Sequence, residues 1–300
     1  MKIGILTETG RTYSPKRLKE AAEKRGHECV IIRYPQCYVD IEQDKPQVRY
    51  EGNIISDIDA IIPRISPSTT GYGTAITRQF EMTGTYALNK SIAIVRSRDK
   101  LRSMQLLSRA GVGIPKTVFS KSTSAVDDLI DIIGVPMIIK VARGSQGNGV
   151  VLAETRKAAK SVVQAFYVEG VSILLQEFVE EAAGADIRAF VVGNKVVASY
   201  KRQSLDDDFR SNIHQGGKGT AIKLTDEERK TALRAAKAMG LQVCGVDLIR
   251  SARGPLVLEV NSAPGLEGIE GVTGRDVAGA IIEYVELNAK RRNKKDKVGA

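Results

Sequence analysis

Two apolar stretches near the C-terminal end each carry one acidic residue. Asp247 lies in VCGVDLIR, and Glu259 lies in VLEVNSAPG, with Asn261 two positions later. Side chains two apart in a strand share a face, and a hairpin that turns at Ser-Ala-Arg-Gly brings Asp247 opposite Glu259. Three hard oxygen donors without His or Cys suit Mg²⁺ or Mn²⁺ better than zinc. The alternative is that both carboxylates pair with Arg250 or Lys201 on an exposed sheet face.

A glycine-rich loop follows another apolar segment. PMIIK ends at Lys140, and RGSQGNGV then places Gly144, Gly147 and Gly149 where backbone amides can approach a phosphate closely. A lysine at the end of a buried strand is unfavourable unless its ammonium meets an anion. These features favour a phosphate site under a mobile cover formed by residues 143–150. The Gly-Lys-Ser/Thr ending of a P-loop is absent, and three glycines at this spacing also occur in ordinary hairpin loops, so a hairpin loop is the alternative interpretation.

Composition limits the class of protein. The chain has 300 residues, of which 42% are hydrophobic and 27% charged, so it can bury the core of an enzyme with one to three domains. The first residues do not form a secretory signal, and no run of 18 apolar residues exists. Three cysteines without CxxC spacing argue against both a disulfide framework and a zinc site. We therefore expect a soluble cytoplasmic protein with no membrane partner.

The net charge of +10 is unevenly distributed. Residues 290–300, KRRNKKDKVGA, form a basic tail that is predicted to be disordered. A solvated end is the simpler interpretation, and electrostatic attraction to RNA or an acidic protein is the alternative. With no Trp and 5% aromatic residues, the chain lacks the aromatic patches expected of a nucleic-acid-binding module.

The first part of the chain reads as a small open α/β domain over residues 1–96. Strands are predicted at 2–7, 29–34, 59–65 and 91–95, and helices at 14–26 and 71–84. Ser14 is the expected N-cap of the first helix, with Pro15 in its first turn. No G-x-G-x-x-G follows the first strand, which disfavours dinucleotide binding.

The remainder mixes helices and hairpins in an α+β manner. Helices are predicted at 97–111, 124–134, 154–166 and 225–240, the last with Thr225 and Glu228 in capping-box spacing. Strands are predicted at 117–119, 136–143 and 172–179, and hairpins at 186–203 and 243–261.

Several of these segments together resemble a known family. RDKLRSMQLL, PMIIK with RGSQGNGV, LLQEFV, DIR, FRSNIHQGG, and GVDLIR through LEVNSAPGLEGIE occur in the order and spacing of the ATP-grasp superfamily. Over the whole chain they resemble the RimK type, the ligases that add glutamate to the C-terminus of a small-subunit ribosomal protein. The resemblance implies an ATP-grasp domain at 104–286, with a central subdomain at about 104–175 and a C-terminal subdomain at about 176–286, preceded by a pre-ATP-grasp domain.

The resemblance also implies roles for matching residues. Lys100 and Lys140 would hold ATP phosphates, Glu177 and Phe178 would read adenine at a hinge, and Asp186 would accept a ribose hydroxyl. Arg210, Ser211 and Asn212 of FRSN would lie in the nucleotide site. Asp247, Glu259 and Asn261 would bind two Mg²⁺ or Mn²⁺ ions. Arg188 and Arg210 would stabilise the charge that develops during phosphoryl transfer. The order NSAPG departs from the family's Asn-Ala-Ser-Pro-Gly but leaves Glu259 and Asn261 in register.

The implied activity is an ATP-dependent carboxylate-amine ligase that adds L-glutamate to a ribosomal protein tail through an acyl phosphate, with poly-glutamate as a side product. We expect a homo-oligomer. A glutamate ligase for a small molecule or an amino-acid carrier protein is the first alternative. A small-molecule kinase and a non-catalytic RNA-binding protein are others; a kinase would leave phosphate on its product, and glutamate-dependent ATP hydrolysis would exclude the RNA-binding protein.

Overall fold

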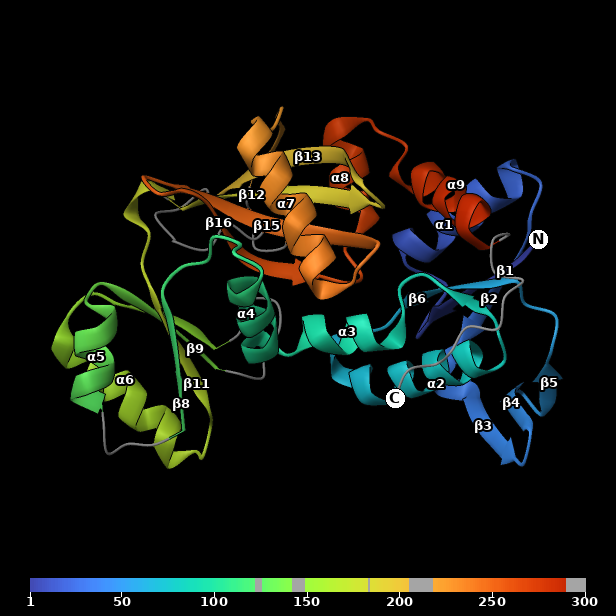
Figure 1. Cartoon of the computed structure of the whole chain (residues 1–300), viewed down its shortest axis with the longest axis horizontal. Coiled ribbons are helices and arrows are strands. Elements are labelled where there is room, and N and C mark those ends of the chain that lie inside the picture. Colours follow the sequence, from blue (N-terminus) through green and yellow to red (C-terminus); the bar gives the residue numbers. More distant parts are fainter. Residues whose placement is uncertain (122–125, 142–148, 183, 205–217, 290–300) are drawn as a thin grey trace.

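The computed structural model describes residues 1–121, 126–141, 149–182, 184–204 and 218–289. Figure 1 shows an elongated molecule in which the N-terminal elements, in blue, lie at one end beside the red helix near residue 280, and the green elements of residues 120–175 lie at the other end. The described strands form one parallel sheet, one small antiparallel sheet and two larger antiparallel sheets.

The first sheet is parallel and has the order β2-β1-β6-β7. Its strands are β1 Lys2–Thr7, β2 Glu28–Arg33, β6 Ala60–Arg64 and β7 Tyr86–Ala87. Ile3 and Ile5 on one face pack with the helices α1 (Tyr13–Lys24) and α9 (Val277–Ala289). Leu6 and Ile61 on the other face pack with α2 (Thr70–Met82). The first and last helices therefore lie side by side over one sheet, as Figure 1 shows.

Two expectations for this region are wrong. Residues 91–95 begin a helix, α3 (Ser91–Arg98), rather than a strand. Glu81 explains the difference, because its carboxylate accepts hydrogen bonds from the Ser91 amide at 2.6 Å and the Ser91 hydroxyl at 2.8 Å. It thus satisfies donors at the start of the helix. Helix α1 begins at Tyr13 after Thr12, so Ser14 is not its N-cap.

A three-stranded antiparallel sheet, not predicted from the sequence, projects from the first domain. It consists of β3 Cys37–Glu42, β4 Lys45–Tyr50 and β5 Asn53–Ile55, and the short helices η1 Tyr34–Gln36 and η2 Pro67–Thr69 lie nearby in the chain.

The four-stranded sheet β10-β9-β11-β8 is antiparallel. Helices cover it through one apolar core. Its elements are β8 Thr117–Ser120, α5 Val126–Ile133, β9 Met137–Val141, β10 Val150–Ala153, α6 Arg156–Val168 and β11 Ile173–Glu177.

The five-stranded antiparallel sheet has the order β14-β13-β12-β15-β16. Its elements are β12 Ala185–Val192, β13 Lys195–Gln203, β14 Lys218–Ala221, β15 Val243–Ser251 and β16 Gly254–Asn261, and η3 Glu180–Ala182 precedes it. The helices around it are α4 Lys100–Arg109, α7 Asp226–Met239 and α8 Leu266–Thr273. The predicted capping box of Thr225 and Glu228 is present at the start of α7.

The two faces of this sheet differ in chemistry. Ile187, Val246 and Val257 share an apolar core with α4 and α7. On the other face, Phe190 and Tyr200 join the core formed by α8 and α9, and the rest of that face carries charged side chains. Among the described residues, every helix is too short or too polar to cross a membrane.

Candidate active site

Asp247, Glu259 and Asn261 lie together on the charged face of the five-stranded sheet. Asp247 on β15 is directly opposite Glu259 on β16, and Asn261 is opposite Gly245, as the predicted hairpin requires. A side chain at Gly245 would crowd Pro264 and Arg188, since an added Cβ would lie 3.0 Å from the Pro264 Cβ. Glycine at this position therefore lets the loop after β16 pass close to the sheet.

A β-bulge controls the direction of Glu259. The register shifts between Asp247 and Leu248, so that Leu248 pairs with Val257 while Asp247 pairs with Glu259, and Leu258 is the extra residue. Val257 is buried in the core beneath the sheet. Without the bulge, Glu259 would share the face of Val257, because side chains two apart in a regular strand do so. The bulge instead turns Glu259 to the face of Asp247.

Two arginines surround Asp247. Arg188 on β12 is directly opposite Asp247, with Nε 2.7 Å from Oδ1 and Nη2 2.6 Å from Oδ2. Arg202 on β13 approaches the same carboxylate at 2.8 Å and is itself paired with Asp186. Burial alone would raise the pKa of Asp247, but the charges of Arg188 and Arg202 hold it well below its ordinary range. Asp247 is therefore a permanently ionised, fixed carboxylate.

The alternative prediction, that Asp247 and Glu259 form ion pairs with Arg250 or Lys201, is wrong in part. An ion pair does exist, but Arg188 and Arg202 form it with Asp247, whereas Arg250 bonds with Glu228 at 2.6 Å. Arg202 was not predicted as a site residue. Its hairpin register opposite Asp186 offered a signal, since oppositely charged residues across strands attract.

Glu259 has a different environment from Asp247. Its side chain is 59% exposed, and its shortest ion-pair distance is 3.9 Å, to Arg188 Nη2. The pKa of Glu259 is nonetheless raised, first by partial desolvation and then by the negative charge of Asp247. Arg188 offsets part of the repulsion between the two opposed carboxylates, but it bonds closely only with Asp247, so the exposed carboxylate of Glu259 stays open to a further cation. The pair therefore fits a divalent cation.

The oxygen set fits a hard cation in its chemistry as well. Asp247 and Glu259 would supply two carboxylates and Asn261 an amide oxygen. The described residues contain no group of three His, Cys, Asp or Glu side chains suited to a metal, so the third oxygen of this set is that of an amide. That oxygen also accepts a hydrogen bond from the Ala263 amide at 3.0 Å, which orients the side chain. Mixed carboxylate and amide oxygens match the ligand preference of Mg²⁺ and Mn²⁺.

The two predicted phosphate-binding lysines lie near Glu259. Lys140 on β9 donates from Nζ to Gln176 Oε1 at 2.6 Å, and its pKa is lowered to about 8, chiefly by desolvation, with Lys100 adding to the effect. The Lys100 ammonium donates to the Val141 carbonyl at 3.3 Å, and its pKa is also lowered by desolvation. The negative charge of Glu259 opposes this effect and raises the pKa of both lysines. The structure thus brings cations from α4 and β9 within electrostatic reach of Glu259.

The remaining predicted residues are placed differently. Glu177 ends β11, accepts the Lys116 amide at 2.7 Å and pairs with Arg253, so it links the four-stranded sheet to the β15–β16 turn. Phe178 follows it and is half-buried. Asp186 is buried, and both its carboxylate oxygens accept hydrogen bonds from Arg202. The predicted Arg210, Ser211 and Asn212, the glycine-loop residues 142–148 and the basic tail at 290–300 lie outside the described residues.

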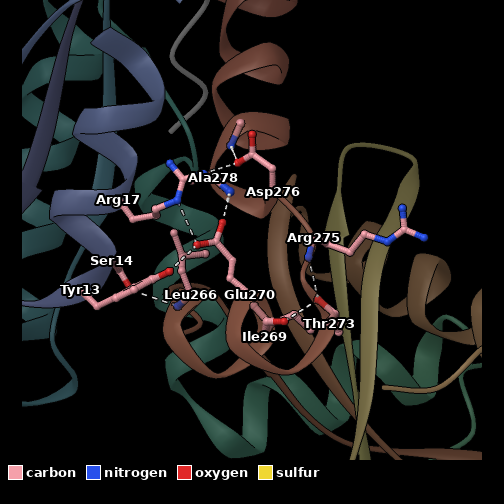
Figure 2. Close-up of polar contacts among 11 residues, drawn as sticks. Tyr13, Ser14, Arg17, Leu266, Ile269, Glu270, Thr273, Arg275, Asp276 and Ala278 are labelled. Atoms are coloured by element: carbon pink, nitrogen blue, oxygen red, sulfur yellow. Dashed lines mark hydrogen bonds and ion pairs between the residues drawn. The ribbon is translucent and has the colours of Figure 1, made fainter. Parts of the chain in front are cut away.

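The loop after β16 is fixed from the first domain. Ser14 Oγ accepts a hydrogen bond from the Leu266 amide at 3.0 Å, so it caps α8 rather than α1. Figure 2 shows Glu270 of α8 between Tyr13, Arg17 and the start of α9. Glu270 accepts the Tyr13 hydroxyl at 2.9 Å and the Ala278 amide at 2.9 Å, and lies 3.3 Å from Arg17 Nε. These contacts hold α8, which directly follows residues 262–265, against the first domain.

Comparison with protein families covers nearly the whole chain. Residues 97–285 match the RimK-like ATP-grasp domain, and residues 1–94 match the RimK pre-ATP-grasp domain. A relative from Vibrio cholerae serotype O1 (strain ATCC 39541), named "Probable alpha-L-glutamate ligase", is 57% identical over 98% of both chains.

Solved structures share the fold. The RimK domain ATP-grasp protein from Sphaerobacter thermophilus has a TM-score of 0.73 at 21% identity, covering 95% of this chain and 99% of that one. The ATP-grasp ligase PsnB, solved with a phosphomimetic variant of its minimal precursor, Mg and ADP, has a TM-score of 0.74 at 19% identity, covering 97% and 98%. At these identities the likeness establishes the ATP-grasp fold with its N-terminal pre-ATP-grasp domain.

Proposed function

Because the chain belongs to the RimK-like ATP-grasp ligase family, we propose that this ATP-dependent ligase joins L-glutamate to the C-terminal carboxylate of a protein acceptor. The glutamate assignment rests on the name of the Vibrio cholerae relative, which matches over almost the full length of both chains. The acceptor we propose is the C-terminal tail of a small-subunit ribosomal protein, with poly-glutamate as a side product. PsnB, a ligase solved with a peptide precursor, is consistent with a peptide acceptor.

The proposed reaction has two steps. An oxygen of the acceptor carboxylate attacks the γ-phosphorus of ATP, the bond to the β-γ bridging oxygen breaks, and ADP leaves. The glutamate amine then attacks the carbonyl carbon of the acyl phosphate, inorganic phosphate leaves with the bonding electrons, and the amine nitrogen loses its proton. The products are a new amide, ADP and phosphate.

The residues of this chain have separate roles in the proposal. Asp247, Glu259 and Asn261 would hold two Mg²⁺ or Mn²⁺ ions, which when bound would neutralise charge on the phosphoryl oxygens. Lys100 and Lys140 bind the phosphates by charge. Arg188 keeps Asp247 ionised and oriented, and lies beside the region where charge develops.

Further roles in the nucleotide site are proposed from the family resemblance. Glu177 and Phe178 would bind adenine at the hinge, and Asp186 would accept a ribose hydroxyl. Arg210, Ser211 and Asn212 complete the nucleotide site. We likewise propose the domain division 1–96 and 104–286. The link from Glu177 to Lys116 and Arg253 supports the hinge, because it connects the two sheets between which a nucleotide would bind.

One observation carries the proposal most directly. The accessible carboxylate of Glu259 is directly opposite the fixed carboxylate of Asp247. Lys140 of the other sheet and Lys100 of α4 act on it electrostatically. This combination of acidic metal ligands and phosphate-binding cations on facing elements suits phosphoryl transfer to a carboxylate.

Intact mass spectrometry tests the acceptor. The candidate ribosomal protein is incubated with enzyme, ATP, Mg²⁺ and glutamate, and mass increases in steps of one glutamyl residue are expected. An unchanged acceptor, with glutamate-dependent ADP release in the presence of a small molecule or a carrier protein, would favour the alternative acceptor class. A phosphorylated product without an amide would contradict ligation.

The basic tail offers a separate test of attraction to ribosomal RNA. We propose that residues 290–300 raise the rate on whole ribosomal subunits at low salt, where exposed charges are least screened. A chain lacking these residues should lose that advantage and retain its rate on isolated acceptor protein. Equal rates of both chains on whole subunits at low salt would refute the role.

A further inference from the structure

Two arginines from the first domain lie beside the loop that follows the proposed metal ligands. Arg64 ends β6, and its Nη2 donates to the carbonyls of Ala263 at 3.3 Å and Pro264 at 2.6 Å. Arg98 ends α3, and its Nη2 donates to the Ile65 carbonyl at 2.8 Å. Arg64 therefore lies at the carboxyl end of a parallel strand, the edge at which open α/β sheets bind ligands.

Neither arginine has an acidic partner. Among the described residues, no carboxylate lies within ion-pair distance of Arg64 or Arg98. The side-chain hydrogen bonds of each arginine in this part of the chain are donated by its Nη2. The Glu8 carboxylate, which follows β1, instead accepts hydrogen bonds from the hydroxyls of Ser66 and Thr69, both at 2.6 Å. Within the described part of the chain, Nε and Nη1 of both guanidinium groups are thus left to solvent or to a ligand.

One of the unused donors is buried. Arg98 Nε has no hydrogen-bond partner, and the only other such buried side-chain atom in the described part of the chain is Ser262 Oγ. Ser262 immediately precedes the Ala263 carbonyl that Arg64 contacts. An unsatisfied buried donor in a native structure calls for an explanation, and a ligand is one. Both unsatisfied atoms belong to segments that meet at Arg64.

The positive charge of Arg98 also disfavours the charged form of Arg64. The pKa of Arg64 is lowered to about 10, first by burial and then by the positive charge of Arg98. Burial likewise lowers the pKa of Arg98, whereas the charge of Glu259 favours its protonated form. Both groups stay charged at neutral pH, so a nearby anion would relieve their repulsion. Arg98 therefore lies within electrostatic reach of Glu259.

We propose that Arg64 and Arg98 together bind a substrate carboxylate, distinct from the carboxylate that is phosphorylated. This inference rests on the proposed function, in which the incoming amino acid is glutamate and the growing acceptor end is glutamyl. A planar guanidinium matches a carboxylate through two parallel hydrogen bonds. The phosphates have their own cations in Lys100 and Lys140, which come from different elements.

The carboxylate has two possible sources, and kinetics distinguish them. The KM values for glutamate, acceptor peptide and ATP are measured separately by ADP release. Removing the charge-assisted contacts in Arg98→Gln is expected to raise the KM for one carboxylate substrate by about 10- to 100-fold, with the KM for ATP unchanged. A change in the glutamate KM assigns the site to the free amino acid, and a change in the peptide KM assigns it to the acceptor.

Two further variants separate binding from structural effects. Arg98→Lys keeps the charge but not the paired donors, so it should recover part of the affinity. Arg96→Gln removes a positive charge from the same helix at a position beside Gly240, and should leave all three KM values unchanged. Thermal unfolding and binding of a nonhydrolysable ATP analogue verify that each variant is folded.

An amide analogue gives an independent measurement. If the site binds free glutamate, either glutamine or glutamate α-amide should be a poorer substrate than glutamate for the wild-type enzyme, and the difference should shrink in Arg98→Gln. Unchanged KM values for both carboxylate substrates in folded Arg98→Gln, or an increase in the ATP KM alone, would overturn the inference. Wild-type enzyme that ligates no glutamate would instead contradict the proposed function.

Discussion

Asp247 and Glu259 are directly opposite each other on β15 and β16, yet their side chains are 4% and 59% exposed. Arg188 and Arg202 neutralise the buried member of the pair, and the bulge at Leu258 presents the accessible member on the same face. One carboxylate is thus fixed by the protein, and the other is available to a ligand.

Replacing Glu259 with Gln should abolish ligation without unfolding the protein. The substitution removes an anionic metal ligand. Mutating a residue that only hydrogen-bonds to a metal ligand lowers activity by up to roughly 100-fold, so loss of the ligand itself should lower turnover by at least that factor. The midpoint of thermal unfolding without metal should not decrease, because repulsion from Asp247 is lost. Turnover measured across a Mg²⁺ series checks this, and near wild-type rates at limiting Mg²⁺ would refute the metal assignment.

Replacing Lys140 with Met should raise the KM for ATP and lower turnover. Losing one charge-assisted phosphate contact should cost about 1.5–3 kcal/mol in kcat/KM. Because the pKa of Lys140 is about 8, its ammonium is charged below that pH and increasingly neutral above it, so ATP affinity should fall as the pH rises through 8.

The Lys140→Arg variant provides the matched control. Its guanidinium stays charged, so the loss of ATP affinity above pH 8 should disappear. Lys157→Met, on the surface of α6, should leave ATP kinetics unchanged. Wild-type ATP kinetics in folded Lys140→Met would assign this lysine a structural role only.

Replacing Ser14 with Ala should destabilise the protein through α8. The hydroxyl is the acceptor for the first amide of that helix, and loss of such a cap costs about 0.5–2 kcal/mol. Ser161→Ala, at an exposed position within α6, is the control and should be neutral or stabilising. Denaturant unfolding compares the two variants, and equal stabilities would show that the contact to α8 contributes nothing.

The ion pair between Glu286 and Arg25 predicts a pH-dependent stability. Arg25 donates to both oxygens of Glu286 at 2.8 and 2.5 Å, and together with His27 lowers the pKa of Glu286 to about 2. A carboxyl whose pKa is lower in the folded state stabilises the fold above its unfolded pKa, and this contribution is lost as the pH falls toward 2.

Replacing Glu286 with Gln should therefore lower the free energy of unfolding at pH 7 by about 0.5–1.5 kcal/mol. The difference from the wild type should shrink between pH 5 and pH 2. Glu283→Gln is the control on the same helix, because the exposed Glu283 forms no ion pair within the described ranges. A stability difference that stays constant with pH would contradict the ion-pair explanation.

Local patterns predicted much of the fold. The capping box at Thr225 and the hairpin that pairs Asp247 with Glu259 depend on neighbouring residues, and both are confirmed. The helix at 91–98 depends on Glu81, which precedes it by ten residues and comes from another helix. Ser14 carries an ordinary N-cap signal, but its partner lies 252 positions away. Such a long-range partner has no signature in a single sequence.

The candidate site divides in the same way. That Asp247, Glu259 and Asn261 share one face was predictable, because alternation within a strand puts side chains two apart on the same face. The bulge at Leu258 was not, although the assignment of Glu259 to that face depends on it. Arg64 and Arg98 escaped prediction because only the tertiary fold brings the first domain against the loop at 262–265.

The position of α9 has a consequence for how the chain folds during its synthesis. Strand β1 leaves the ribosome first, yet Ile3 and Ile5 on one face of its sheet are covered in part by Val277, Ile281 and Val285 of α9. The nascent first domain must therefore wait for almost the whole chain before that apolar face is sealed. Until then the face is open to chaperones and to aggregation. A chain whose translation stops before residue 277 would keep the part of that surface under α9 exposed.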